Sequence, residues 1–101
     1  MTLSVEHRKD RNEVVIRLPE QFDFKVHRDF RSAYSENKAI GASYIVDLGR
    51  TKYMDSSALG MLLQLREHAG SDAKKVHLVN IHPDVMEILR IANLDKLLTI
   101  N

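Results

Sequence analysis

Apolar residues recur along this chain with two different spacings, and the spacing separates the expected strands from the expected helices. Short continuous or alternating apolar runs are typical of strands, and they begin the chain, recur along it and end it. They cover residues 3–7, 13–18, 44–48, 75–81 and 96–100. The charged, turn-prone segment Arg8-Lys9-Asp10-Arg11-Asn12 separates the first two runs, so the chain should begin with a β-hairpin.

Three longer segments space their apolar residues three and four positions apart, as amphipathic helices do. They are residues 26–37, 57–69 and 83–93. The positions expected to face the core are Val26, Phe30, Ala33, Tyr34, Asn37, Ala58, Met61, Leu62, Leu65, Ala69, Val85, Ile88, Leu89 and Ala92. Pro19 cannot donate a ladder hydrogen bond, so residues 19–24 should form a loop after the second strand.

Strands and helices alternate after the hairpin, which predicts a largely parallel sheet covered by helices. A chain of 101 residues is long enough for one compact domain and too short for two. We therefore expect a single α/β domain over residues 1–101. It should contain a mixed, mostly parallel β-sheet of four to five strands covered by about three to four helices.

Composition excludes several classes of function. Hydrophobic residues make up 44% of the chain and charged residues 29%, with a net charge of +1 and no long basic stripe, so we expect no nucleic-acid partner. The chain lacks cysteine and its histidines show no metal-ligand spacing, so we expect no metal site and no cofactor. No segment resembles a signal peptide or a membrane span, so we expect a cytoplasmic protein without a membrane partner.

The most informative chemistry lies where the strand at residues 44–48 runs through a polar loop into the second helix. Asp55-Ser56-Ser57 stands at the start of that helix, where backbone N–H groups are unpaired and the helix dipole favours negative charge. Such a place suits a phosphoryl group. It also suits a helix cap, for which serine and aspartate are preferred, and the pattern alone favours this purely structural role. Since one cap suffices, a serine hydroxyl is left over.

The order of elements, together with Met54-Asp55-Ser56-Ser57-Ala58-Leu59-Gly60, resembles the STAS domain of anti-sigma-factor antagonists over essentially the whole chain. Arg17-Leu18 followed by Phe22-Asp23 resembles the family's loop after the second strand, which commonly carries an acidic residue at the position of Asp23. The resemblance implies the STAS fold. Glu20-Gln21 and Ala58 depart from residues common in the family, and these differences bear on which partner is recognised.

In bacterial members of this family, the unphosphorylated protein captures a partner kinase and the phosphorylated protein releases it. The resemblance therefore implies an anti-sigma-type serine kinase with a histidine-kinase-like ATPase domain, which brings the ATP, and a serine phosphatase of the PP2C type. By position it implies phosphorylation at Ser56, with Ser57 as the structural cap. The downstream output would be transcription that controls stress responses or biofilm behaviour.

A partner-binding surface is expected around Ser56. Its expected residues are Asp23, Met54, Asp55, Ser57, Leu59 and Leu63, with Tyr53 beside them. Leu59 and Leu63 lie off the inner stripe of the second helix, and packing at the periphery of the core is at least as good an interpretation for them. A phosphoserine carries about −1.5 to −2 charges, so repulsion from neighbouring carboxylates would release a partner.

Two other functions remain open. In the first, the chain is a non-phosphorylated STAS module that docks on a larger assembly such as a transporter, and Ser56 is only a cap. In the second, it is a small enzyme that uses Asp23, Asp55 and Ser56. No histidine or lysine completes such a site in the local sequence, so we expect no enzymatic activity and no catalytic residue.

Overall fold

A five-stranded sheet forms the centre of the computed structural model, which describes residues 3–35 and 41–100. Its strands, in spatial order, are β1 (Ser4–Arg8), β2 (Glu13–Arg17), β4 (Ser43–Asp47), β6 (Val76–Val79) and β7 (Thr99–Ile100). Only the pairing of β1 with β2 is antiparallel. The predicted hairpin and the predicted mixed, mostly parallel sheet are thus confirmed.

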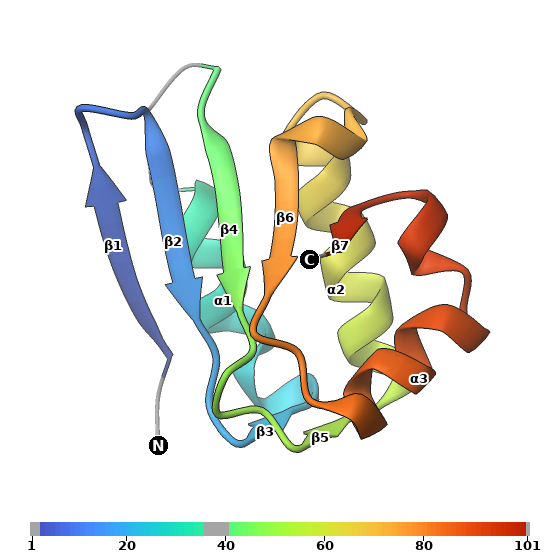
Figure 1. The fold of residues 1–101 in the computed structure, drawn as a ribbon. Helices are drawn as coiled ribbons and strands as arrows, with labels where there is room; N and C mark the ends of the chain where they lie inside the picture. Colours follow the sequence, from blue (N-terminus) through green and yellow to red (C-terminus); the bar gives the residue numbers. More distant parts are fainter. Residues whose placement is uncertain (1–2, 36–40, 101) are drawn as a thin grey trace.

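In the described part of the chain, three α-helices connect the parallel strands. They are α1 (His27–Ser35), α2 (Ser56–His68) and α3 (Pro83–Ile91), and short 3₁₀ turns are η1 (Phe24–Val26), η2 (Ala73–Lys75) and η3 (Leu94–Lys96). Figure 1 shows α1 and α2 together behind the sheet, with α3 beside the end of α2. Because successive connections lead to the next strand in the same direction, the helices gather on one face. The core lies between the sheet and these helices.

A second, two-stranded sheet lies below the main one in Figure 1, at the end to which β2, β4 and β6 point. It pairs β3 (Gln21–Phe22) with β5 (Tyr53–Met54) in parallel. We call this pair the ribbon. The prediction of a plain loop over residues 19–24 was wrong, because two-residue strands are too short to produce an alternating pattern in the sequence.

Charged side chains of β1 and β2 cover part of the sheet face that points away from α1 and α2. Arg17 Nη2 lies 2.9 Å from Glu6 Oε1 and Arg8 Nε lies 3.1 Å from Glu6 Oε2, and these two guanidinium groups lower the pKa of Glu6. Val15, opposite Glu6 across the strands, is only 3% exposed although it lies outside the core cluster. Val15 lies between Glu6 on β1 and Ile45 on β4 in the strand register.

The predicted core stripes are largely confirmed, with boundaries shifted by one or two residues. Val26 is buried but belongs to η1, and Asn37 lies outside the described residues. Ala92 was predicted to face the core but is exposed, because α3 ends at Ile91 and Ala92 is its C-cap. Within the described residues, no helix is long and apolar enough to cross a bilayer.

Candidate functional site

The ribbon places Asp23 and Asp55 next to each other. Phe22 and Met54 are register partners, and both side chains are buried in the core. The next residue along each strand is an aspartate, so Asp23 and Asp55 leave the ribbon at the same end and point away from the core. The backbone N–H of Asp55 donates to the Phe22 carbonyl at 3.4 Å, and this bond links the ends of the two strands.

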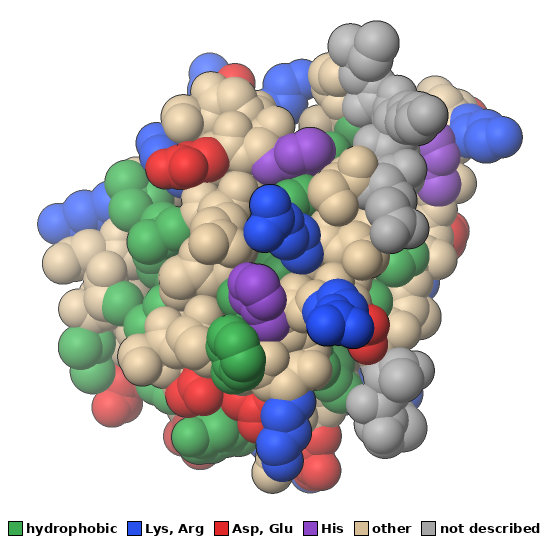
Figure 2. All heavy atoms as spheres, turned by 180° about the vertical axis from the view of Figure 1, so that it is seen from behind, with side chains coloured by type: hydrophobic (Ala, Val, Ile, Leu, Met, Phe, Trp, Pro, Cys, Tyr) green, Lys and Arg blue, Asp and Glu red, His purple; other side chains and the backbone are tan. Residues whose placement is uncertain are grey.

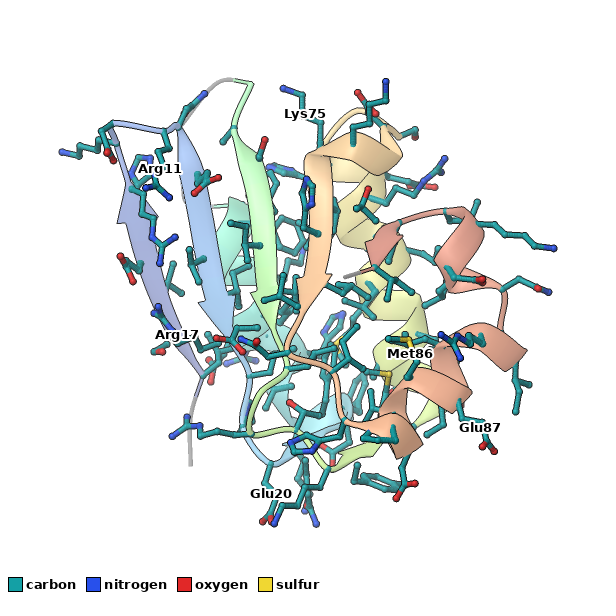
Figure 3. All side chains as sticks on the ribbon, in the orientation of Figure 1. Arg11, Arg17, Glu20, Lys75, Met86 and Glu87 are labelled. Atoms are coloured by element: carbon teal, nitrogen blue, oxygen red, sulfur yellow. The ribbon has the colours of Figure 1, made fainter. Side chains whose placement is uncertain are left out.

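Hydrogen bonds also hold together the two loops that enter the ribbon. Thr51, which is fully buried, donates its hydroxyl to the Pro19 carbonyl at 2.9 Å. The backbone N–H groups of Lys52 and Tyr53 both donate to the Glu20 carbonyl. Figure 3 shows Glu20 beside the ribbon, at the end of the sheet opposite to Arg11 and Lys75. Thr51 was not predicted from the sequence, because a threonine in a polar loop carries no signal of burial.

A contact from the start of α3 holds the segment that follows β4 and leads to Ser56. His82, the N-cap residue of α3, has its Nε2 atom 2.8 Å from the Gly49 carbonyl oxygen. Asp47 Oδ1 accepts from the Gly49 backbone N–H at 2.8 Å and from the Asn80 side-chain amide at 3.1 Å. Gly49, in the segment that leads from β4 to Ser56, is therefore held by Asp47 at the end of β4 and by His82 at the start of α3.

Asp55, and not Ser57, caps α2. Asp55 has extended backbone geometry, and its Oδ1 atom accepts from the Ala58 backbone N–H at 3.0 Å. The Ser57 hydroxyl donates to the same carboxylate oxygen at 2.6 Å. The prediction that Ser57 is the cap was thus wrong, because a longer, charged acceptor one residue before the helix satisfies the terminal N–H group.

The cap determines the charge state of the site. The Ser57 hydroxyl, together with the backbone N–H groups of Ala58, Ser57 and Asp55, lowers the pKa of Asp55 below its ordinary value of 3.8. Asp55 is therefore an anion at neutral pH and a poor proton donor or acceptor. Ser56, the first residue of α2, is exposed next to this anion.

Asp23 has the same local role as Asp55. It is the N-cap of η1, and its Oδ1 atom accepts from the Lys25 backbone N–H at 2.9 Å. A shallow hollow of about 220 Å³, lined in part by Glu20, Gln21 and Asp23, lies beside it. This volume is below the roughly 300–1,000 Å³ of typical small-molecule pockets.

The apolar residues predicted for the partner surface differ in their exposure. Met54 is only 3% exposed and packs in the core, so the prediction that it contributes to a binding surface is not supported. Its strand alternation with Tyr53 explains this, since Tyr53 points outward and is 51% exposed. Leu59 and Leu63 are half-buried and pack against the core, so both interpretations of these residues retain support.

Gly60 is a further residue on the surface of α2. It is exposed, and a Cβ atom added there would meet no heavy atom within 4 Å. Gly60 lies four residues after Ser56, so the two lie on the same side of α2. The space-filling view in Figure 2, which shows the molecule from behind, has Lys and Arg side chains scattered over the visible face rather than gathered in one band. Among the described residues, no three His, Asp or Glu side chains form a group that could hold a metal ion.

The chain is similar to known proteins both in sequence and in fold. The family model described as "Mlab, STAS domain" matches residues 5–99. A STAS-domain containing protein from Pseudomonas aeruginosa strain UCBPP-PA14 is 45% identical over 92 residues, which is 91% of each chain.

Among solved structures, the unphosphorylated anti-sigma factor antagonist SpoIIAA is 25% identical with a TM-score of 0.69, over 89% of this chain and 83% of that chain. The phosphorylated form of the Bacillus protein SpoIIAA gives 24% and 0.72, over 99% and 91%. An anti-sigma-factor antagonist domain protein from Planctomyces limnophilus shares the fold with a TM-score of 0.81 at 19% identity, over 100% and 90%. The chain therefore belongs to the STAS-domain family.

Proposed function

We propose that this protein is a phosphorylatable protein-binding switch. In its unphosphorylated form it binds a partner, and phosphorylation of Ser56 releases that partner. The observation that carries the proposal is the exposure of Ser56 at the start of α2, beside a cap that Asp55 already provides. Ser56 is therefore available for modification without loss of the hydrogen bonds that begin the helix.

The electrostatics of the junction support release by charge. The N-terminus of α2 stabilises a dianionic phosphate, so the domain need not refold when it is modified. Asp55 and Asp23 add two carboxylates at the same end of the ribbon. A partner that docks here would have to desolvate a phosphate next to these anions, and burying unpaired charge is costly.

The proposed partner is a serine kinase of the anti-sigma type with a histidine-kinase-like ATPase domain. It would transfer the γ-phosphoryl group of ATP to Ser56, and a PP2C-type phosphatase would hydrolyse the phosphoserine. SpoIIAA, which this chain resembles, has been solved in both unphosphorylated and phosphorylated form. We place the protein in the cytoplasm, in a circuit that controls transcription for stress responses or biofilm behaviour.

The switch is proposed to be a substrate of enzymes and not an enzyme. Both carboxylates of the site are engaged in capping, and the lowered pKa of Asp55 removes it from the range useful for general acid or base catalysis. The purified chain should accordingly show no intrinsic ATPase or hydrolase activity.

The test is mass spectrometry of the protein taken from its native cells under several growth conditions, beside a Ser56→Ala strain. A phosphoryl group on Ser56, in a fraction that changes with conditions, is the expected result. A chain that is never modified, with partner regulation intact in the Ser56→Ala strain, would overturn the switch and favour a docking module.

A further inference from the structure

The two serines at the start of α2 are adjacent in sequence but differ in chemical environment. The Ser57 hydroxyl donates to Asp55 Oδ1 at 2.6 Å, and the half-buried Ser57 side chain is part of the cap. Ser56 is exposed, and its hydroxyl makes no hydrogen bond to the described residues. Only one of these hydroxyls is therefore already committed to a charged acceptor.

Modification of the two serines would have opposite consequences for the cap. A phosphoryl group on Ser57 Oγ would replace the donated proton and place a dianion against the Asp55 carboxylate, where like charges repel. A phosphoryl group on Ser56 leaves the Asp55–Ser57 hydrogen bond and the Asp55–Ala58 hydrogen bond in place. The geometry therefore separates a tolerated product from a strained one.

We propose that Asp55 is a positioning residue that directs phosphoryl transfer to Ser56 by holding the Ser57 hydroxyl. This inference rests on the proposed function. In the transfer, a bond forms between Ser56 Oγ and the γ-phosphorus of ATP, and the bond from that phosphorus to the bridging β–γ oxygen breaks. ADP leaves, and the hydroxyl proton passes to a base of the kinase or to water.

The backbone at position 55 permits a clean test. Asp55 has φ −106° and ψ −177°, which is extended geometry that glycine adopts freely. Glycine is also a tolerated N-cap residue, so Asp55→Gly removes the acceptor with little damage to the helix. Asp55→Asn is the matched control, because its side-chain oxygen still accepts from Ser57 and Ala58.

The experiment localises phosphate in the full-length wild type, Asp55→Asn and Asp55→Gly proteins, each expressed from the native locus, by peptide mass spectrometry. We expect phosphate on Ser56 in all three. The ratio of Ser57 to Ser56 phosphate should rise at least about tenfold in Asp55→Gly, the effect of losing one charge-assisted hydrogen bond, and less in Asp55→Asn, which keeps the hydrogen bond but not the negative charge. Phosphate that stays on Ser56 alone in Asp55→Gly overturns the inference and leaves the proposed function standing.

Two further outcomes are decisive. If wild type and Asp55→Asn are phosphorylated but Asp55→Gly is not modified at all, Asp55 serves kinase docking and not the choice of serine. A wild type that is never phosphorylated defeats the proposed function, and this inference with it.

A second experiment needs no kinase and measures the pKa of Asp55 by NMR titration. This pKa should rise in Ser57→Ala and stay low in Ser57→Thr, which keeps the hydroxyl. An unchanged pKa of Asp55 in Ser57→Ala would show that the Ser57 hydroxyl does not stabilise the carboxylate, and this would overturn the inference.

Discussion

Asp23 and Asp55 are equivalent in position and in role: each directly follows a strand of the ribbon, and each caps the helix that comes next. The backbone N–H groups of Lys25 and Ala58 donate to their carboxylates at 2.9 and 3.0 Å. Two carboxylates are thereby fixed at the same end of the ribbon. The negative charge around Ser56 is therefore already in place before a partner binds.

Substitution of Ser56 should change binding without changing the fold. Ser56→Ala is expected to stay in the partner-bound form in cells, because the hydroxyl that accepts phosphate is gone. Ser56→Asp should weaken the partner, though less than phosphate does, since one carboxylate carries less charge than a dianion. Calorimetric titration against the purified partner measures the affinities of the two variants. Ser35→Asp, at an exposed serine at the end of α1, is the control for added charge. Equal affinity of Ser56→Asp and wild type would contradict release by charge.

Gly60→Ala should raise stability and lower partner affinity. The added methyl group meets nothing within 4 Å inside the chain, and alanine in a helix interior is favoured over glycine by about 0.5–1 kcal/mol. On the proposed surface, however, the methyl group occupies space beside Ser56, and overpacking an interface by about 1–3 kcal/mol corresponds to a loss of roughly fivefold to a hundredfold in affinity. Denaturant unfolding and titration calorimetry report the two effects separately.

Gly70→Ala is the matched control for this prediction. Gly70 follows the C-cap of α2 with φ +89°, a left-handed conformation that costs alanine about 1–2 kcal/mol. This variant should lose stability and keep its partner affinity. An affinity loss in Gly70→Ala as large as that in Gly60→Ala would contradict the prediction, because the loss would then not be specific to contact at Gly60.

The Asp55 cap predicts a specific dependence of stability on pH. Because the folded-state pKa of Asp55 lies below its ordinary value of 3.8, the folded protein binds fewer protons there than the unfolded chain. The cap therefore stabilises the fold fully above pH 3.8, and the contribution is lost as pH falls through the lowered pKa. Ser57→Ala should be less stable than wild type at neutral pH, and the difference should narrow in acid. Urea unfolding between about pH 7 and about pH 2.5 tests this, with Ser56→Ala expected to follow wild type.

Tyr53→Ala should weaken the partner while leaving the fold intact. Tyr53 is 51% exposed on the outer side of the ribbon, two residues before Asp55, and aromatic side chains are frequent anchors at interfaces. We expect a loss of about tenfold in affinity. Val5→Ala is the control, since Val5 is 46% exposed on β1 at the far edge of the sheet. Similar affinities of the two variants would place the partner elsewhere.

Most of the main sheet and its helices followed from the sequence, because long stretches such as residues 44–48 and α2 repeat one spacing. The ribbon did not, since Gln21 and Phe22 offer a single inward position and no period. The identity of the cap also escaped, because Asp55, Ser56 and Ser57 are all good caps and only backbone geometry separates them. Ala92 was misplaced because a helical period gives no sign of where the helix stops.

The buried bond from Thr51 to the Pro19 carbonyl joins two loops that are 32 residues apart in sequence. One of these loops leads to Asp23 and the other to Asp55 and Ser56. In evolutionary terms the two loops should not change independently, because a substitution that shifts one loop also shifts the other through this bond. Divergence of partner recognition among related proteins should therefore proceed through paired substitutions in residues 19–23 and 49–56, with the threonine retained as the joint.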